Sequence, residues 1–271
     1  MARFIVLGFI LIFIAYIYAD MQRISIKRYS FKTKDTLKLL QLSDLHRRNF
    51  GKSNNRLIKV IKKENPNVVV FTGDLISRNQ TDFSNIENLI REVCRFTKVY
   101  YILGNHELDM NKSTCKVLCN HLQSYGATLL DNQGVYIAPS TKLWGLTVPL
   151  KCYHDGNHGY DNIYHYLTSD LQSTLQVPNS QDFNILLAHN PFFFDSYSSW
   201  GADLTLCGHV HGGIVRLPIV NGVLSPERKL FPKYSGGMYS IGNNNMIVSR
   251  GLGKLRIFNP PEISIIEIKS F

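Results

Sequence analysis

The chain has 271 residues, of which 44% are hydrophobic and 18% charged, a composition that supports one large folded domain and excludes a disordered chain. Its five cysteines have no regular spacing, which excludes a disulfide framework and a zinc site built from paired Cys-x-x-Cys motifs. The formal net charge of +10 predicts attraction to anions. Because there is no aromatic RNA-binding motif and no long basic run, we expect no nucleic acid as a stable partner, and we expect a monomer.

The N-terminus contains an unbroken apolar run from Phe4 to Ala19. At ~1.5 Å per residue this run is slightly short for a bilayer, but its flanking residues can extend it. A cleaved signal peptide is the alternative interpretation. Because Ile17 and Tyr18 make a poor cleavage site before Ala19, we favour an uncleaved membrane anchor over residues 1–22.

A basic segment, residues 23–36, follows the apolar run and is expected to be a neck before a domain over residues 37–271. Its cationic residues outnumber Arg3 and the amino terminus on the other side of the run. By the positive-inside tendency, the domain leans toward the cytoplasm. Alternatively these residues are a solvated linker and first strand, and their charges then say nothing about topology.

Three strand–helix units follow one another in the first half of the domain. The strands are expected at Leu37–Leu42, Asn67–Phe71 and Lys98–Leu103. An amphipathic helix around Leu57–Ile61 follows the first strand, and a capping box of Ser84 and Glu87 predicts the start of the second helix. The third helix carries an apolar stripe at Cys115–Leu122. This succession predicts a parallel, helix-covered sheet.

The second half has fewer helices and more strands. Strands are expected at Lys142–Thr147, Phe183–Ala188, Asp203–Leu206, Gly213–Leu217, Asn245–Ser249 and Glu262–Ile268. No linker rich in proline, serine or glycine divides the two halves, so a second sheet packed on the first is expected rather than a separate domain. The predicted fold is α/β, a four-layer sandwich of two mostly parallel or mixed β-sheets flanked by helices.

Polar residues follow the C-terminal ends of several predicted strands, where open α/β sheets place their functional sites. They are Asp44, Asp74, Asn105, His189, His209 and His211. Each taken singly is explained as a turn former or helix cap. Turns and caps do not require Asp-x-His, Gly-Asp, Gly-Asn-His-Glu and Gly-His-x-His in one chain, so together they indicate a site.

The residue types in these motifs favour a pair of transition-metal ions. Imidazole and carboxylate ligands together suit Mn, Fe, Zn or Co better than Mg or Ca. One carboxylate must bridge two ions ~3.5–4 Å apart, and Asp74 is the best placed. Because Asn105 is neutral, the pair of ions keeps an excess positive charge that a phosphodiester and a hydroxide would neutralise. The motifs therefore predict a two-metal phosphoesterase.

The pattern resembles the calcineurin-like metallophosphoesterase superfamily, whose motifs match here from Asp44 to His211. The resemblance implies two sets of metal ligands: Asp44, His46, Asp74 and His211 for one ion, and Asp74, Asn105, His189 and His209 for the other. It also implies that His106 acts as an acid or electrostatic aid near the leaving group. The expected reaction is in-line attack on phosphorus by a hydroxide that bridges the ions.

Segments near the C-terminus resemble a membrane-associated bacterial branch of this superfamily, which includes phosphodiesterases and is similar to enzymes that cleave UDP-2,3-diacylglucosamine. They are Gly208–Gly213, Leu230–Tyr234, Ser249–Gly253 and Pro261–Glu262. The resemblance implies a phosphodiester or pyrophosphate bond in a lipid-linked or membrane-located substrate. The segment Gly253–Phe258, between the glycine turn and the final strand, is shorter than this branch leads us to expect. The alternatives are a soluble nucleotide or nucleic-acid phosphodiesterase and a metal-free binding scaffold.

Two further segments flank the predicted site. Arg47 and Arg48 follow His46 and are candidates to bind a second phosphate or a lipid head group, although a solvated loop explains them equally. The stretch Tyr153–Tyr166 is expected to be a surface insertion that shapes specificity. Its histidines, His154, His158 and His165, are expected to be polar surface groups because the metal ligands are already complete.

Overall fold

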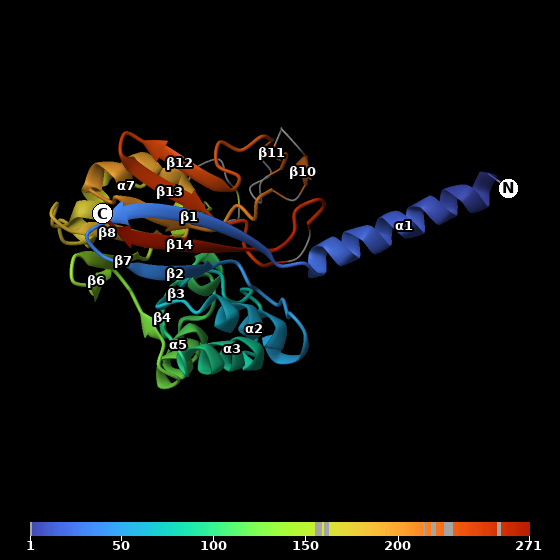
Figure 1. Cartoon of the computed structure of the whole chain (residues 1–271), viewed down its shortest axis with the longest axis horizontal. Helices are drawn as coiled ribbons and strands as arrows, with labels where there is room; N and C mark the ends of the chain where they lie inside the picture. Colours follow the sequence, from blue (N-terminus) through green and yellow to red (C-terminus); the bar gives the residue numbers. More distant parts are fainter. Residues whose placement is uncertain are drawn as a thin grey trace.

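The computed structural model describes residues 2–154, 159, 163–213, 215–217, 221–224, 230–253 and 256–271. Helix α1 (Ala2–Gln22) extends away from a domain built on two β-sheets (Figure 1). Its Arg3–Gln22 stretch has a mean hydropathy of 2.3 and is unburied. A helix of this length and composition fits either a membrane span or a signal sequence.

The first sheet has six strands in the order β1-β14-β2-β3-β4-β5. Their bounds are β1 Ser25–Thr33, β2 Leu37–Leu42, β3 Val68–Thr72, β4 Lys98–Ile102, β5 Thr128–Leu129 and β14 Glu262–Ser270. Strands β2 to β5 are parallel, as the repeated strand–helix units predicted, whereas β14 runs antiparallel to β2. The helices that follow the parallel strands are α2 (Asn55–Glu64), α3 (Ser84–Cys94), α4 (Asn105–Leu108) and α5 (Lys112–Ser124).

The second sheet also has six strands, in the order β12-β13-β9-β8-β7-β6. Their bounds are β6 Gln133–Ala138, β7 Thr141–Leu146, β8 Phe183–Ala188, β9 Leu204–Cys207, β12 Gly237–Ile241 and β13 Asn244–Val248. The four inner strands are parallel, and β6 and β12 are antiparallel edges. Helices α6 (Thr168–Thr174) and α7 (Phe194–Trp200) accompany this sheet, and β10 (Arg216–Leu217) pairs with β11 (Asn221–Gly222) separately.

The two sheets pack face to face through apolar side chains. Leu39 and Val70 of the first sheet join Ile185 and Leu206 of the second in one cluster, and all four are fully buried. A second cluster lies between the first sheet and its helices, and a third covers the opposite face of the second sheet. The predicted four-layer α/β sandwich is confirmed, and burial of these inner faces is its main source of stability.

Part of the expected neck is a strand. Ser25–Thr33 pairs in parallel with β14, from Ser25 opposite Glu262 to Thr33 opposite Ser270. Tyr29, Phe31 and Thr33 are more buried than their neighbours, which is the alternation typical of a strand with one covered face. The cationic residues of this segment lie along an edge strand, where they discourage pairing with other chains.

Local details of the prediction also differ from the structure. Helix α3 has no capping box, because the backbone N–H of Ser84 donates to Asp82 Oδ1 (2.9 Å) and the Glu87 carboxylate lies 2.7 Å from His121 Nδ1. Asp82 thus accepts the backbone N–H that the Glu87 carboxylate would accept in a capping box, and the N–H of Glu87 donates to the carbonyl of Phe83 instead. The strand expected at Gly213–Leu217 is shorter, and β5, β6 and β12 were not predicted.

A buried carboxylate connects the turns after β3 and β4. Glu107 is fully buried, and its Oε2 accepts the backbone N–H groups of Asp74 (2.9 Å) and Gly104 (2.7 Å). Its Oε1 accepts the backbone N–H of Ile76 (3.0 Å). Three buried donors therefore depend on one side chain, and the two turns are fixed relative to each other.

We expect Glu107→Gln to lower the free energy of unfolding by about 1–3 kcal/mol, because the amide nitrogen replaces an acceptor and leaves a buried N–H without a partner. Urea unfolding followed by circular dichroism measures this change. Glu92→Gln is the control, since Glu92 pairs with Arg95 on the helix surface and should contribute little. An unchanged midpoint for Glu107→Gln would show that the carboxylate does not fasten the turns.

Candidate metal centre

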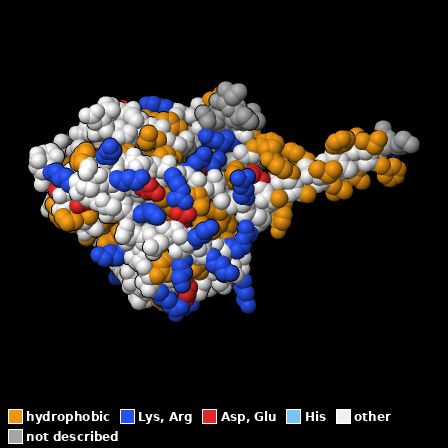
Figure 2. All heavy atoms as spheres, in the orientation of Figure 1, with side chains coloured by type: hydrophobic (Ala, Val, Ile, Leu, Met, Phe, Trp, Pro, Cys, Tyr) orange, Lys and Arg blue, Asp and Glu red, His pale blue; other side chains and the backbone are white. Residues whose placement is uncertain are grey.

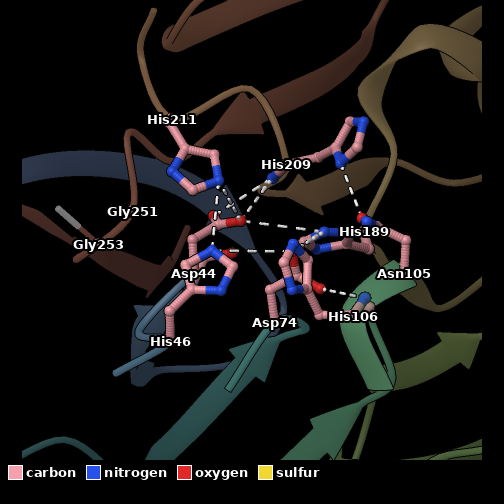
Figure 3. Close-up of polar contacts among 12 residues, drawn as sticks. Asp44, His46, Asp74, Asn105, His106, His189, His209, His211, Gly251 and Gly253 are labelled. Carbon is pink, nitrogen blue, oxygen red and sulfur yellow. Dashed lines mark hydrogen bonds and ion pairs between the residues drawn. The ribbon is translucent and has the colours of Figure 1, made fainter. Parts of the chain in front are cut away.

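The residues predicted to form the site meet at one edge of the sandwich. Asp44 follows β2, Asp74 follows β3 and Asn105 begins α4 directly after β4. His189 follows β8, and His209 follows β9 in the other sheet. The parallel strands of each sheet end at the same edge, which brings these turns together, and Figure 3 shows their side chains gathered around Asp44 and Asp74, with the His209 ring turned toward Asn105.

The backbone at the site is held in an unfavourable conformation. Five of the candidate ligands have φ between 51° and 73°, in the left-handed region that residues other than glycine rarely adopt: Asp44, His46, Asp74, His209 and His211. Such strain persists only where the surrounding structure imposes it, and it is concentrated at functional sites. The sharp turns aim each side chain inward at the strand end.

One group of four residues has the composition and spacing of a metal site. One ligand atom each from Asp44, His46, Asp74 and His211 lie within 4.8 Å of one another. His46 Nε2 is 3.4 Å from His211 Nε2 and 3.8 Å from Asp74 Oδ2, while His211 Nε2 is 3.5 Å from Asp44 Oδ1. This is the first ligand set that the family resemblance implies.

A second group shares Asp74 with the first. His189 Nε2 is 3.3 Å from Asp74 Oδ2, and His209 Nδ1 is 3.0 Å from Asn105 Oδ1. His189 is fully buried, and its Nδ1 lies 2.6 Å from the carbonyl of Thr72, which makes Nδ1 the donor. Apart from this approach to Asp74, its buried Nε2 has no hydrogen-bond partner, as expected of a nitrogen that faces a bound cation.

The electrostatics of the pocket call for positive charge. Burial alone would raise the pKa of Asp74, but His189, His106 and His46 bring it well below its usual range, so this carboxylate stays ionised. Burial lowers the pKa of His189, yet the charges of Asp74 and Asp44 raise it to about 10. The two carboxylates make the pocket negative enough to favour a proton on an entirely buried imidazole. Bound cations would be stabilised by the same negative charge, so the donors present fit a pair of divalent ions.

His106 lies beside this cluster and is partly exposed. Its Nδ1 accepts the backbone N–H of Arg78 (3.1 Å), so in the neutral ring the proton is on Nε2. That nitrogen is 3.8 Å from Asp74 Oδ2, and the side chain is 23% exposed. Burial lowers the pKa of His106 to about 4, which keeps the ring neutral and leaves a hydrogen-bond donor at the mouth of the site.

The two arginines after His46 have different places. Arg47 is exposed, donates to the carbonyl of Asn79 (2.8 Å) and lines a cleft of about 410 Å³ next to His46. Arg48 is 4% exposed, donates to the carbonyl of Met21 at the end of α1 and lies over the Phe50 ring. The structure therefore brings Arg47, but not Arg48, to the cleft.

Both ends of the described part of the stretch Tyr153–Tyr166 are buried, whereas Tyr164 and His165 are exposed. Tyr153 is 2% exposed, and its ring centroid is 5.1 Å from that of His209. His154 is also buried, with Nε2 3.9 Å from Asp109 Oδ1, so its interpretation as a surface group was wrong. His165 is exposed as expected, and His158 lies outside the described residues. An aromatic side chain here excludes water from the imidazoles.

Three residues that support the site were not identified from sequence. Glu107 had a signal, since it completes the Gly-Asn-His-Glu motif, but no role was assigned to it. Tyr153 had none beyond its aromatic character. Arg256 is 2% exposed and donates to the carbonyls of Gly253 (2.7 Å) and His211 (3.3 Å), which holds the last turn of the site in place.

The sequence is similar to those of proteins described as metallophosphoesterases, phosphodiesterases and pyrophosphatases. The chain is 28% identical to the metallophosphoesterase YkuE of Bacillus subtilis, over 87% of this chain and 80% of that protein. It is 25% identical to the phosphodiesterase YaeI of Escherichia coli (85% and 82% covered). It is 24% identical to the UDP-2,3-diacylglucosamine pyrophosphatase LpxG of Chlamydia muridarum (85% and 83% covered).

The fold is shared with solved structures of low sequence identity. A dimetal phosphatase from Danio rerio superposes with a TM-score of 0.52 at 12% identity, covering 80% of this chain and 88% of that one. Residues 37–213, which span the whole cluster of carboxylates and imidazoles, match the calcineurin-like phosphoesterase family. This chain is a member of the calcineurin-like phosphoesterase family and a metal-dependent phosphoester hydrolase.

Proposed function

We propose that the chain hydrolyses a phosphodiester or pyrophosphate bond with two metal ions, in a substrate located at a membrane. The observation that carries the two-ion part is the position of Asp74, whose Oδ2 lies within 3.8 Å of His46 on one side and 3.3 Å of His189 on the other. A carboxylate between two groups of imidazoles is suited to bridge two ions.

The chain would hold one ion with Asp44, His46, Asp74 and His211, and the other with Asp74, Asn105, His189 and His209. When bound, the ions would activate water and neutralise charge on the phosphoryl oxygens. Mn, Fe, Zn and Co all suit this mixture of imidazole and carboxylate donors. Ligand orientation is supplied by the chain itself, since Asp44 accepts the backbone N–H of His209 (3.1 Å).

His106 would assist departure of the leaving group. Its Nε2–H is directed by the hydrogen bond that Arg78 N–H makes to Nδ1, so the ring is already oriented as a donor. The adjoining cleft, which is lined by Arg47, Asn79 and Gln80 among others, would receive the part of the substrate beyond the reacting phosphate.

Two parts of the proposal, the type of phosphate bond that is cleaved and the location of the substrate at a membrane, are supported by different observations. The relatives described as a phosphodiesterase and as a pyrophosphatase of a lipid-linked nucleotide favour an internal phosphate ester or anhydride over a monoester. The apolar helix α1 favours a membrane anchor, and hence a substrate found there. A soluble nucleotide phosphodiesterase using the same ligands is the second candidate.

We expect Asp74→Asn to reduce metal content from two ions per chain to one or none and to abolish turnover. The reason is that a neutral amide lacks the negative charge that a carboxylate brings to the position between two cations. Metal analysis and Mn-dependent hydrolysis of bis-p-nitrophenyl phosphate test this. Asp131→Asn, at an exposed position, is the control. If Asp74→Asn still binds two ions and turns over at the wild-type rate, Asp74 does not bridge the ions. If the wild-type protein contains no transition metal, the chain is better explained as a metal-free binding scaffold.

We expect His106→Ala to retain both ions and to lose turnover by ~10²–10⁴, because the hydrogen bond that Nε2–H would donate to the departing oxygen is lost. The loss should be larger for an alkyl leaving group than for p-nitrophenolate, which departs without protonation. His121→Ala, on the surface of α5, is the matched control. Equal losses for both leaving groups would exclude His106 as the donor to the departing oxygen.

We expect the full-length chain to hydrolyse a pyrophosphate-linked lipid or a lipid phosphodiester in vesicles at least tenfold faster than a soluble dinucleotide. The reason is that an anchored enzyme meets its substrate at the interface. Initial rates with and without vesicles, compared with a soluble dinucleotide, measure the preference. Equal efficiency toward the soluble dinucleotide would favour the second candidate.

A further inference from the structure

Phe258 connects helix α1 with the metal centre. Its ring centroid lies 6.1 Å from that of Phe13 and 5.9 Å from that of Tyr16, both in α1. It is 40% exposed, and its φ of 54° is a left-handed conformation unusual for a bulky residue. A backbone strained so as to leave an aromatic ring outside the core suggests a function for that ring.

The depth of this contact along α1 is informative. Tyr16 and Phe13 precede Asp20, the first charged residue after the apolar run, by four and seven residues. At 1.5 Å per residue they lie about 6 and 10 Å inside the apolar part of the helix. A membrane that surrounds α1 up to Asp20 would therefore also reach the ring that touches Phe13.

Two more exposed apolar side chains belong to the same part of the domain. Leu230 is 67% exposed and Phe231 is 60% exposed, and Phe231 also has a positive φ of 49°. A short ladder of backbone contacts runs from Phe231 through Val223 and Val215 to Ile257, the neighbour of Phe258. Solvated domains rarely expose such residues together without a partner.

Two arginines hold the base of α1 next to this apolar area, and of these Arg56 is exposed whereas Arg48 is buried. Arg48 and Arg56 donate to the carbonyls of Met21 and Gln22, the last residues of the helix. Figure 2 shows hydrophobic side chains where α1 meets the domain, with Lys and Arg side chains close by. Apolar residues bordered by cations match a bilayer with anionic head groups.

The segment that carries Phe258 is fixed to the site. Arg256 and Asn259, on either side of it, both donate to the carbonyl of His211 (3.3 and 2.8 Å). Asn259 is fully buried and also donates to Gly213 (2.8 Å). Gly253 packs closely against the His46 ring, because a Cβ atom added at residue 253 would lie only 3.1 Å from His46 Cδ2. Movement of Phe258 relative to the metal centre is therefore restricted.

We infer that Phe258, with Leu230 and Phe231, forms a wedge that enters the lipid leaflet crossed by α1 and holds the metal centre at the membrane surface. The inference rests on the proposed anchoring by α1. It specifies the substrate class further, as an amphiphile whose apolar tail stays in the bilayer while its phosphate reaches the ions.

The wedge is tested with the full-length chain in phosphatidylethanolamine–phosphatidylglycerol vesicles that contain brominated lipids. In Phe258→Trp, we expect bromines near the top of the acyl chains to quench the added fluorescence at least twofold more than in Tyr136→Trp, whose site on β6 is also exposed. The native Trp144 and Trp200 are buried and give a common background. Equal quenching in the two variants, or failure of the chain to bind vesicles, would overturn the inference.

A second variant separates the wedge from a structural role. Asparagine tolerates positive φ, so Phe258→Asn should keep wild-type turnover of a soluble diester while losing several-fold on a vesicle-borne lipid phosphodiester. Equal losses on both substrates, or a concentration-dependent dimer that this variant abolishes without any quenching, would overturn the wedge. The quenching measurement does not depend on turnover. If Phe258→Trp is quenched but the chain hydrolyses no lipid ester, the proposed substrate is refuted while insertion of the wedge still holds.

Discussion

The site depends on one buried, ionised carboxylate, that of Asp74. It is 1% exposed, and imidazoles of His46, His106 and His189 surround it within 3.8 Å. Its other oxygen accepts the backbone N–H of His106 (2.9 Å). An acceptor in this position sets much of the charge of the pocket, because it is the carboxylate that these three imidazoles share, whereas Asp44 lies 3.9 Å from His189 Nε2.

The fold delivers that carboxylate by packing two sheets face to face, so that the C-terminal ends of their parallel strands lie at the same end of the sandwich. The buried inner faces fix the sheets relative to each other, so turns from distant parts of the chain meet within a few ångströms. Glu107 then fixes the turns after β3 and β4 by accepting their backbone N–H groups. Arg256 and Asn259 fix the His211 turn by donating to the carbonyl of His211. Rigid support of this kind is what a two-ion site requires of its ligands.

The parallel strands and the polar side chains at their ends could be predicted because both leave strong local signals. Buried β-branched runs mark the strands, and Asp74 or His209 directly after such a run has few structural explanations. Arg48, Tyr153 and His154 were misjudged because their surroundings come from other parts of the chain, which neighbouring residues do not reveal. The Ser84 capping box failed for a different reason, since Asp82 competes for the same backbone donor and Glu87 meets His121.

The place of β14 has a consequence for how the chain acquires its structure. This strand lies between β1 and β2, so among the described residues β1 pairs with β14, which follows it by more than two hundred positions in the sequence. During synthesis, β1 stays without this partner until Glu262–Ser270 has emerged. Such long-range pairing slows folding and leaves a strand edge open to other chains, which gives the positive charges of β1 a protective task before the sheet closes.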